Sequence, residues 1–218
     1  LGLLPLLAFL GGALTTTLVY LLGTREGGTS VTVMLLAGVA ITALSGAVIG
    51  LLTYLADDQM LRNLSLWQMG SLAAGKPVDV GLALLTLVAL LWLFMRDANP
   101  LNALLLGEGE ARHLGVNVQC LKRRLILLTA AGVGVAVAVA GMIGFVGLVV
   151  PHLVRLLAGP NHVRLLPLSA LLGAALLLGA DMLARTLLAP AELPVGIITA
   201  LLGAPFFIWL LVKSRRTL

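Results

Sequence analysis

The chain is built from long apolar segments separated by short polar ones, and the apolar residues come in continuous runs. A helix that crosses the hydrocarbon core of a bilayer needs about 20 apolar residues. This rule predicts six spans, at Leu3–Leu22, Val31–Leu55, Val80–Met95, Leu125–Met142, Leu165–Leu183 and Val195–Val212. A shorter apolar piece, Phe145–Leu157, carries polar residues toward its end, and its length alone does not show whether it crosses.

The distribution of basic residues favours a crossing by the short piece. If it crosses, and if the basic tail that begins at Lys213 is cytoplasmic, 11 of the 14 lysines and arginines lie inside and only Arg62, Lys76 and Arg185 lie outside. If it does not cross, the same residues divide 7 to 7. The positive-inside rule therefore predicts seven crossings. A short crossing is tolerable if the helix is buried among its neighbours, which small residues at every third position, Gly141, Gly144 and Gly147, would permit.

Composition agrees with this pattern and excludes a soluble globular domain. Of the 218 residues, 60% are hydrophobic and 11% charged, and the mean hydropathy is +1.11. The predicted fold is an all-α integral membrane protein, a polytopic bundle of about seven transmembrane helices that forms one domain over residues 1–218. Because the chain begins inside an apolar run, we expect it to be the C-terminal portion of a longer polypeptide.

The predicted outer loop, Ala56–Asp79, has the pattern of a short amphipathic helix. Leu61, Leu64 and Leu72 fall near one helical face, with Trp67 and Met69 nearby. An aromatic anchor at the membrane interface explains Trp67 equally well.

The longest polar stretch, Arg96–Arg124, is predicted to be cytoplasmic. Its segment GEGEARHLG predicts a short helix bounded by Gly107 and Gly115, with Glu108 and Glu110 in the first turn, where the helix dipole favours acids. The stretch is either a solvated loop between membrane helices or a docking element for a soluble partner.

No arrangement typical of catalysis is present in the sequence. There is no nucleophile with a base and an acid, no metal-ligand spacing and no Gly-rich phosphate loop, so we expect no enzyme, no cofactor and no bound metal. The histidines His113, His152 and His162 are all predicted on the cytoplasmic side, which argues against a ladder of ligands through the membrane.

Ionisable residues are scarce within the predicted spans. The exception is Asp181 with Arg185, which are four residues apart on one helix face. They form either a structural ion pair or a site where Arg185 meets an acidic partner. A secondary transporter driven by protons or sodium would keep acids near the bilayer midplane. The scarcity of acids within the predicted spans of this chain favours a transport passage that takes its energy from a separate ATPase.

Several motifs together resemble the iron-chelate, haem and vitamin B12 permease family of bacterial ABC importers (FecCD type). They are LLAGVAITAL (35–44), WQMGSL (67–72), LGEGEARHLGV (106–116), AGMIGFVGLVVPHLVRLL (140–157), ADMLAR (180–185) and ELPVGIITALLGAPFFIWLL (192–211). The resemblance covers essentially the whole chain. It implies helices four to ten of a ten-helix type II permease, without the first three.

The resemblance also implies partners and site residues. The expected partners are a second permease copy, a cytoplasmic ABC ATPase dimer, a periplasmic substrate-binding protein and membrane lipid, with no nucleic acid, in the bacterial inner membrane. Arg185 would dock the binding protein, and Ser30, Val31 and Thr32 would form the cytoplasmic gate, with Val31 where relatives can have a hydroxyl residue. The positions that would couple to the ATPase are Gly107, Glu108, Ala111, Arg112, Leu114 and Gly115.

The sequence is less informative about the substrate. SLWQMGSL preceded by DDQMLR is more similar to haem-transporting members than to vitamin B12 members, and ferric siderophore permeases share much of it. We therefore expect import of haem or a ferric siderophore. Vitamin B12 transport, an ion-coupled secondary transporter and an assembly subunit without a passage of its own stay as alternatives.

Overall fold

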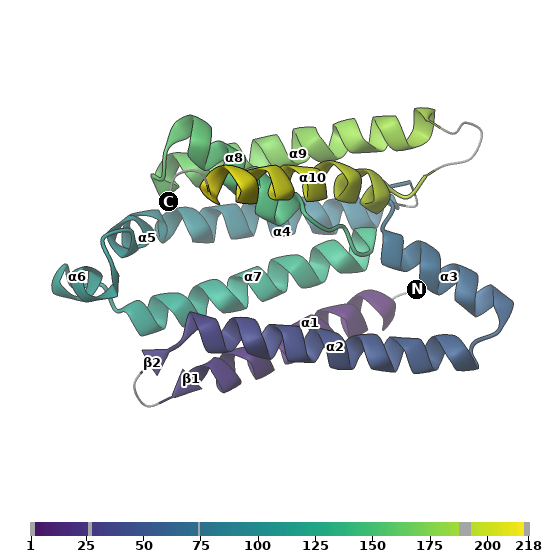
Figure 1. Cartoon of the computed structure of the whole chain (residues 1–218), viewed down its shortest axis with the longest axis horizontal. Coiled ribbons are helices and arrows are strands. Elements are labelled where there is room, and N and C mark those ends of the chain that lie inside the picture. The colour runs from purple at the N-terminus through teal and green to yellow at the C-terminus, as the bar shows by residue number, and fades with distance from the viewer. Residues whose placement is uncertain (1–2, 26–27, 74, 188–192, 216–218) are drawn as a thin grey trace.

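The computed structural model describes residues 3–25, 28–73, 75–187 and 193–215, and these are almost entirely helical (Figure 1). Two-residue strands, β1 (Thr24–Arg25) and β2 (Gly28–Thr29), pair antiparallel in a small hairpin. The helices are α1 (Leu3–Gly23), α2 (Val31–Leu55), α3 (Asp58–Met69), α4 (Pro77–Arg96), α5 (Ala98–Leu104), α6 (Glu108–His113), α7 (Val118–Ala140), α8 (Val146–Ala158), α9 (His162–Thr186) and α10 (Val195–Arg215).

Each predicted span corresponds to an apolar helix. Four helices, α2, α4, α7 and α9, are long and apolar enough to cross a membrane. Three shorter apolar helices, Leu7–Gly23 within α1, Val146–Ala158 and Val195–Leu210 within α10, account for the other predicted spans. The chain is thus an all-α polytopic membrane protein, as predicted.

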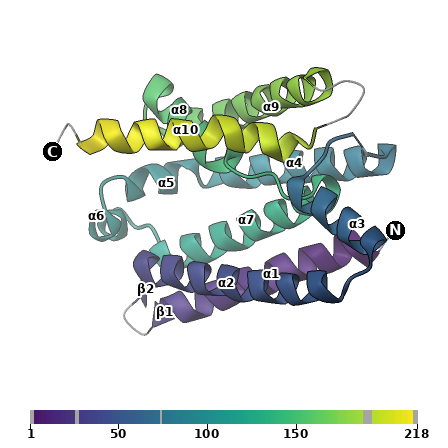
Figure 2. The same cartoon turned by 45° about the vertical axis from the view of Figure 1, so that its right-hand side comes forward.

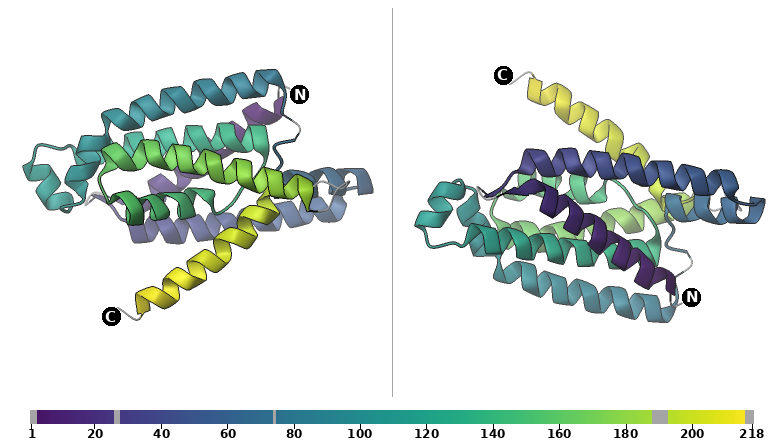
Figure 3. Two further views of the ribbon diagram at one scale, coloured as in Figure 1. Left: turned by 90° about the horizontal axis from the view of Figure 1, so that it is seen from above. Right: turned by 90° about the horizontal axis from the view of Figure 1, so that it is seen from below.

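The helices run roughly lengthwise in one bundle (Figures 1 and 2). α7 packs against α1 and α4, α2 packs against α1, and α9 packs against α4, α8 and α10. The β hairpin, α5, α6 and the C-terminal end of α10 share one end, which we call the inner end; α3 and the start of α10 lie at the opposite, outer end. The segments predicted to be cytoplasmic are therefore together. Figure 3 shows α10 diverging from the bundle toward the inner end.

Several helices begin earlier than hydropathy predicts because their first turns are polar. The side chain of Asn117 accepts the Cys120 N–H at 3.1 Å and caps α7, although the apolar run begins only at Leu125. Asn161 likewise caps α9 by accepting the Val163 N–H at 3.0 Å. Asn is a strong N-cap residue, so the cap and not the hydrophobic run sets each start.

The amphipathic outer helix is confirmed as α3. Asp57 caps it by accepting the Met60 N–H at 2.8 Å, and Leu61, Leu64 and Trp67 are partly buried. Leu72 lies beyond the end of the helix and packs on the outer core between α9 and α10.

Three segments meet at the outer end in what we call the outer junction, formed by Gly70, Gly141 and Gly196. A Cβ on Gly141 would lie 2.5 Å from the Trp67 carbonyl oxygen, and one on Gly70 would lie 2.7 Å from the Met142 carbonyl oxygen. Gly196, on α10, has no room for a side chain beside the Met69 carbonyl. Close backbone contact of this kind requires residues without a side chain. The junction therefore joins α3, the α7–α8 connection and α10.

The α7–α8 connection corrects one prediction. Gly144 lies outside the helix and Gly147 inside it, but a Cβ on either would meet nothing within 4 Å. Among the described residues, the close packing that Gly141, Gly144 and Gly147 would permit is therefore found only at Gly141. In the predicted crossing, a non-helical segment would make the outer part, and the 13 residues of α8, about 20 Å long, would make the inner part. Phe145, which joins the two parts, has φ +66°, a strained conformation for an aromatic residue.

Candidate functional site

The polar stretch at the inner end folds into α5 and α6, which connect α4 to α7. Gly107 and Gly115 flank α6 with φ +106° and +82°, and the space around both is open. Glycine is therefore favoured at both positions because the backbone has positive φ, and not because a side chain would clash with its surroundings. The predicted short helix with acids in its first turn is confirmed.

The six predicted coupling positions differ in exposure. Gly107, Glu108, Arg112, Leu114 and Gly115 are exposed at the inner end. Ala111 is completely buried, and its carbonyl accepts the Val116 N–H at 2.9 Å. In this conformation Ala111 cannot contact a partner, and it instead holds α6 against the bundle.

A salt bridge fixes the start of this element to α7. Asp97, between α4 and α5, is only 2% exposed, and its two carboxylate oxygens accept hydrogen bonds from Nε (2.8 Å) and Nη2 of Arg124. A buried carboxylate needs such pairing, and a bidentate guanidinium supplies it with fixed geometry. No local sequence pattern predicts this pair, because its members are 27 residues apart.

A second polar cluster attaches α5 to the start of α9. Asn102 donates from Nδ2 to Asn161 Oδ1 at 3.0 Å. Its own Oδ1 accepts the His162 backbone N–H at 2.7 Å and lies 3.0 Å from His162 Nδ1. Asn102 thus satisfies one of the N–H groups that a helix start leaves without an intrahelical partner. This cluster, too, was not predicted.

A third link joins α6 to α7. Glu108, the first residue of α6, accepts a hydrogen bond from Lys122 Nζ at 2.5 Å, and its other oxygen lies 3.9 Å from Arg112. The Lys122 side chain is only 14% exposed. The element is therefore held by side chains to α7 and α9 as well as by the covalent chain.

The predicted gate residues lie at the start of α2. Ser30 caps the helix by accepting the Val33 N–H at 3.4 Å, and its own N–H donates to the Gly23 carbonyl at 2.9 Å. Thr32 is exposed, as is Val31 at 61%. Val31 lines an open apolar hollow of about 430 Å³ whose other wall includes Lys122 on α7. The structure thus places the predicted gate beside the same lysine that binds α6.

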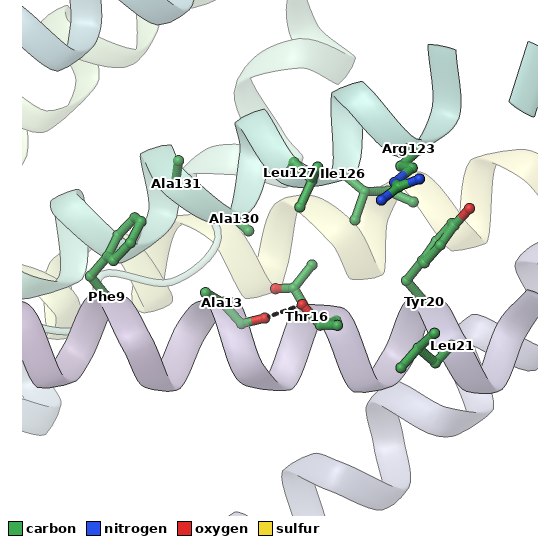
Figure 4. A pocket seen from close by; sticks show the side chains of 11 residues that line it. Phe9, Ala13, Thr16, Tyr20, Leu21, Arg123, Ile126, Leu127, Ala130 and Ala131 are labelled. Atoms are coloured by element: carbon green, nitrogen blue, oxygen red, sulfur yellow. Dashed lines mark hydrogen bonds between the residues drawn. The ribbon is translucent and has the colours of Figure 1, made fainter. Parts of the chain in front are cut away.

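A groove of about 380 Å³ runs between α1 and α7 (Figure 4). Its walls are mainly apolar, since Thr16 and Thr17 donate their hydroxyls to the Gly12 and Ala13 carbonyls of their own helix. Tyr20 and Arg123 lie together at one end of the groove, near the inner end of the bundle. The groove is therefore an apolar surface with a polar mouth.

At the outer end, Asp181 and Arg185 form the predicted ion pair on α9. Arg185 Nε donates to Asp181 Oδ2 at 2.8 Å, and the arginine side chain remains 48% exposed. The structural and the functional interpretation are thus compatible, because the paired guanidinium still reaches solvent.

The fold defines a class: a polytopic α-helical membrane protein in which a folded polar element, α5–α6, connects two apolar helices at one end. The model of the FecCD transport family matches residues 1–213, and the chain belongs to this family, as its motifs predict.

Similarity to individual proteins supports the same family assignment. The chain is 51% identical over 209 residues to the hemin transport system permease protein HmuU of Yersinia pestis, which covers 96% of this chain and 62% of the relative. It is 46% identical over 204 residues to the vitamin B12 import system permease protein BtuC of Vibrio cholerae, covering 94% and 61%. A solved structure described as an inward-facing metal-chelate type ABC transporter superposes with a TM-score of 0.79 at 37% identity, over 84% of this chain and 60% of that one. The chain thus spans about six tenths of the length of these relatives.

Proposed function

We propose that this chain is part of the transmembrane permease subunit of an ATP-driven importer that moves haem or a ferric siderophore into the bacterial cytoplasm. The observation that carries the proposal is the inner element α5–α6, built between two membrane helices in a chain of the FecCD family. The similarity to a hemin permease supports haem, and the nearly equal similarity to vitamin B12 permeases makes vitamin B12 the alternative substrate.

In this proposal ATP hydrolysis takes place in a separate cytoplasmic ATPase dimer. The exposed positions of α6, with Glu108 and Arg112 at their centre, contact the ATPase, and Ala111 holds the helix in place. A periplasmic binding protein docks at the outer end near Arg185, and a second permease copy completes the passage in the inner membrane. The gate at Ser30–Thr32 changes its opening when α6 moves.

Such coupling requires that the ATPase bind the two states of the permease with different affinity. The three polar links connect this element to α7 through Glu108 and Asp97 and to α9 through Asn102, which supports a defined path for the motion of α6. A solvated loop without a role would need neither the buried Asp97 carboxylate nor these links to two other helices.

Charge reversal tests the coupling assignment. In proteoliposomes that contain the full-length permease with its ATPase and binding protein, Glu108→Lys with Arg112→Glu should lower uptake of haem at least tenfold while ATP hydrolysis continues. Glu110→Lys is the matched control, because Glu110 is an exposed acid in the same turn of α6. Unchanged uptake in the double variant would remove α6 from the proposal.

The outer contact is tested in the same way. Arg185→Glu should weaken docking of the binding protein, measured by surface plasmon resonance, whereas Arg62→Glu, an exposed arginine on α3, should leave it unchanged. Equal affinities of the Arg185 variant and the parent would contradict the docking role.

Uptake measurements separate the remaining alternatives. The vesicles are loaded with ATP and offered haem, a ferric siderophore and vitamin B12 in turn. The compound that is taken up identifies the substrate class. Uptake driven by an ion gradient without any ATPase would instead support a secondary transporter.

A further inference from the structure

Lys122 has a position that none of the predicted roles explains. It lies in the second turn of α7, close to the predicted membrane boundary, and its side chain is only 14% exposed. Its ammonium group is 2.5 Å from a carboxylate oxygen of Glu108, on the helix proposed to contact the ATPase. A mostly buried ammonium group without a partner is costly, so the pair favours keeping the two groups together.

The same side chain reaches the predicted gate. Lys122 lines the hollow of about 430 Å³ with Val31, Met34 and Leu35 from the first turns of α2. A lysine presents an apolar four-carbon stem to such a surface while its charged head binds elsewhere. Lys122 therefore contacts α6 and faces the same hollow as the start of α2.

The two basic neighbours of Lys122 do not share this position. Arg124 pairs with Asp97, and Arg123 lines the separate groove between α1 and α7. Consecutive residues of a helix point in directions about 100° apart, so three adjacent cations serve three different surfaces.

We propose that Lys122 is the positioning residue that links α6 to the inner gate. The inference rests on the proposed function and identifies the residue through which the motion passes. When the ATPase shifts α6, the ammonium group of Lys122 follows the Glu108 carboxylate. The stem then moves within the hollow, and Val31, which lines the same hollow, repacks with the first turn of α2.

The test reports on the gate directly. A single cysteine at Val31 is introduced in a background in which Cys120, the cysteine of this chain, and any cysteine elsewhere in the full-length permease are replaced by Ser. In the full-length permease assembled with its ATPase, we expect ATP to change the labelling rate of Val31→Cys by a membrane-impermeant maleimide at least threefold. Lys122→Met, which keeps the apolar stem and removes the charge, should reduce this change to less than 1.5-fold.

Three further variants keep the test informative if Lys122→Met assembles poorly. Glu108→Gln removes the same ion pair from the exposed side and should have the same effect. Lys122→Arg should retain it. Arg123→Met, the control, removes an adjacent charge that does not face the hollow and should leave the response intact.

The outcomes separate this link from the function on which it rests. A normal response to ATP in both Lys122→Met and Glu108→Gln would overturn the link and leave the importer proposal standing. A parent that transports substrate but shows no change at Val31→Cys would overturn both the link and the gate assignment. Loss of the response in Lys122→Arg as well as in Lys122→Met would show that the charge of Lys122 does not carry the link, which also overturns the proposal.

Discussion

The outer junction makes a quantitative prediction at Gly141. This residue is the C-cap of α7 with φ +72° and ψ −166°, a conformation that essentially only glycine adopts. Gly159, the C-cap of α8, has nearly the same backbone, φ +84° and ψ 179°. A Cβ on Gly141 would lie 2.5 Å from the Trp67 carbonyl oxygen, whereas one on Gly159 would meet nothing within 4 Å. The two sites therefore differ in packing and not in backbone strain.

Alanine at both sites separates these two effects. The backbone strain should cost each variant about 1–3 kcal/mol. Gly141→Ala should cost about 1–3 kcal/mol more, the usual range for forcing an extra carbon into a packed site. For a chain of this size, an extra cost of about 2 kcal/mol lowers the midpoint of thermal unfolding by roughly 4–8 °C.

The measurement is thermal unfolding in mild detergent, followed by tryptophan fluorescence, since Trp67 lies at the junction. Gly144→Ala, at a site with open space, serves as a baseline and should unfold near the parent temperature. If Gly141→Ala and Gly159→Ala unfold at the same temperature, the junction contributes no packing constraint and the reasoning fails.

Three other predictions concern the polar links and caps. Asp97→Asn should destabilise the protein by about 1–3 kcal/mol, below the range for a fully buried pair because Arg124 is half exposed, and an unchanged unfolding temperature would refute this. Asn102→Ala removes the acceptor of the His162 backbone N–H and should cost about 1–2 kcal/mol, with faster hydrogen exchange confined to the first turn of α9. Asp57→Ala should cost about 1 kcal/mol and speed exchange in α3, so exchange that is equally slow in both proteins would contradict the cap.

The membrane helices were largely predictable because their signal is local. The predicted span Val31–Leu55 coincides with α2, and the amphipathic pattern after Asp57 gave α3. The starts of α7 and α9 were missed by several residues, since hydropathy marks where apolar residues begin and Asn117 and Asn161 cap the helices earlier.

The inner element was predictable only in outline. Glycines and acids near Glu108 indicate a short helix, but no local pattern shows that Asp97 pairs with Arg124 or that Asn102 reaches α9. These contacts join residues far apart in the chain, and they depend on how the helices pack. For the same reason the burial of Ala111 could not be inferred, because its neighbours in sequence are polar.

The helix α9 connects the two ends of the molecule in a way that has a mechanical consequence. Asn102 holds the N-terminal end of α9, which we call its foot, and Arg185 lies near the C-terminal end, its tip. Pro167 interrupts the backbone hydrogen bonding near the foot, because proline lacks the N–H that would reach the Val163 carbonyl. The stiff arm above this pivot is about 27 Å long, so a tilt of about 5° would displace its tip by about 2 Å. A disturbance too small to notice at the foot would be large enough at the tip to make or break a salt bridge.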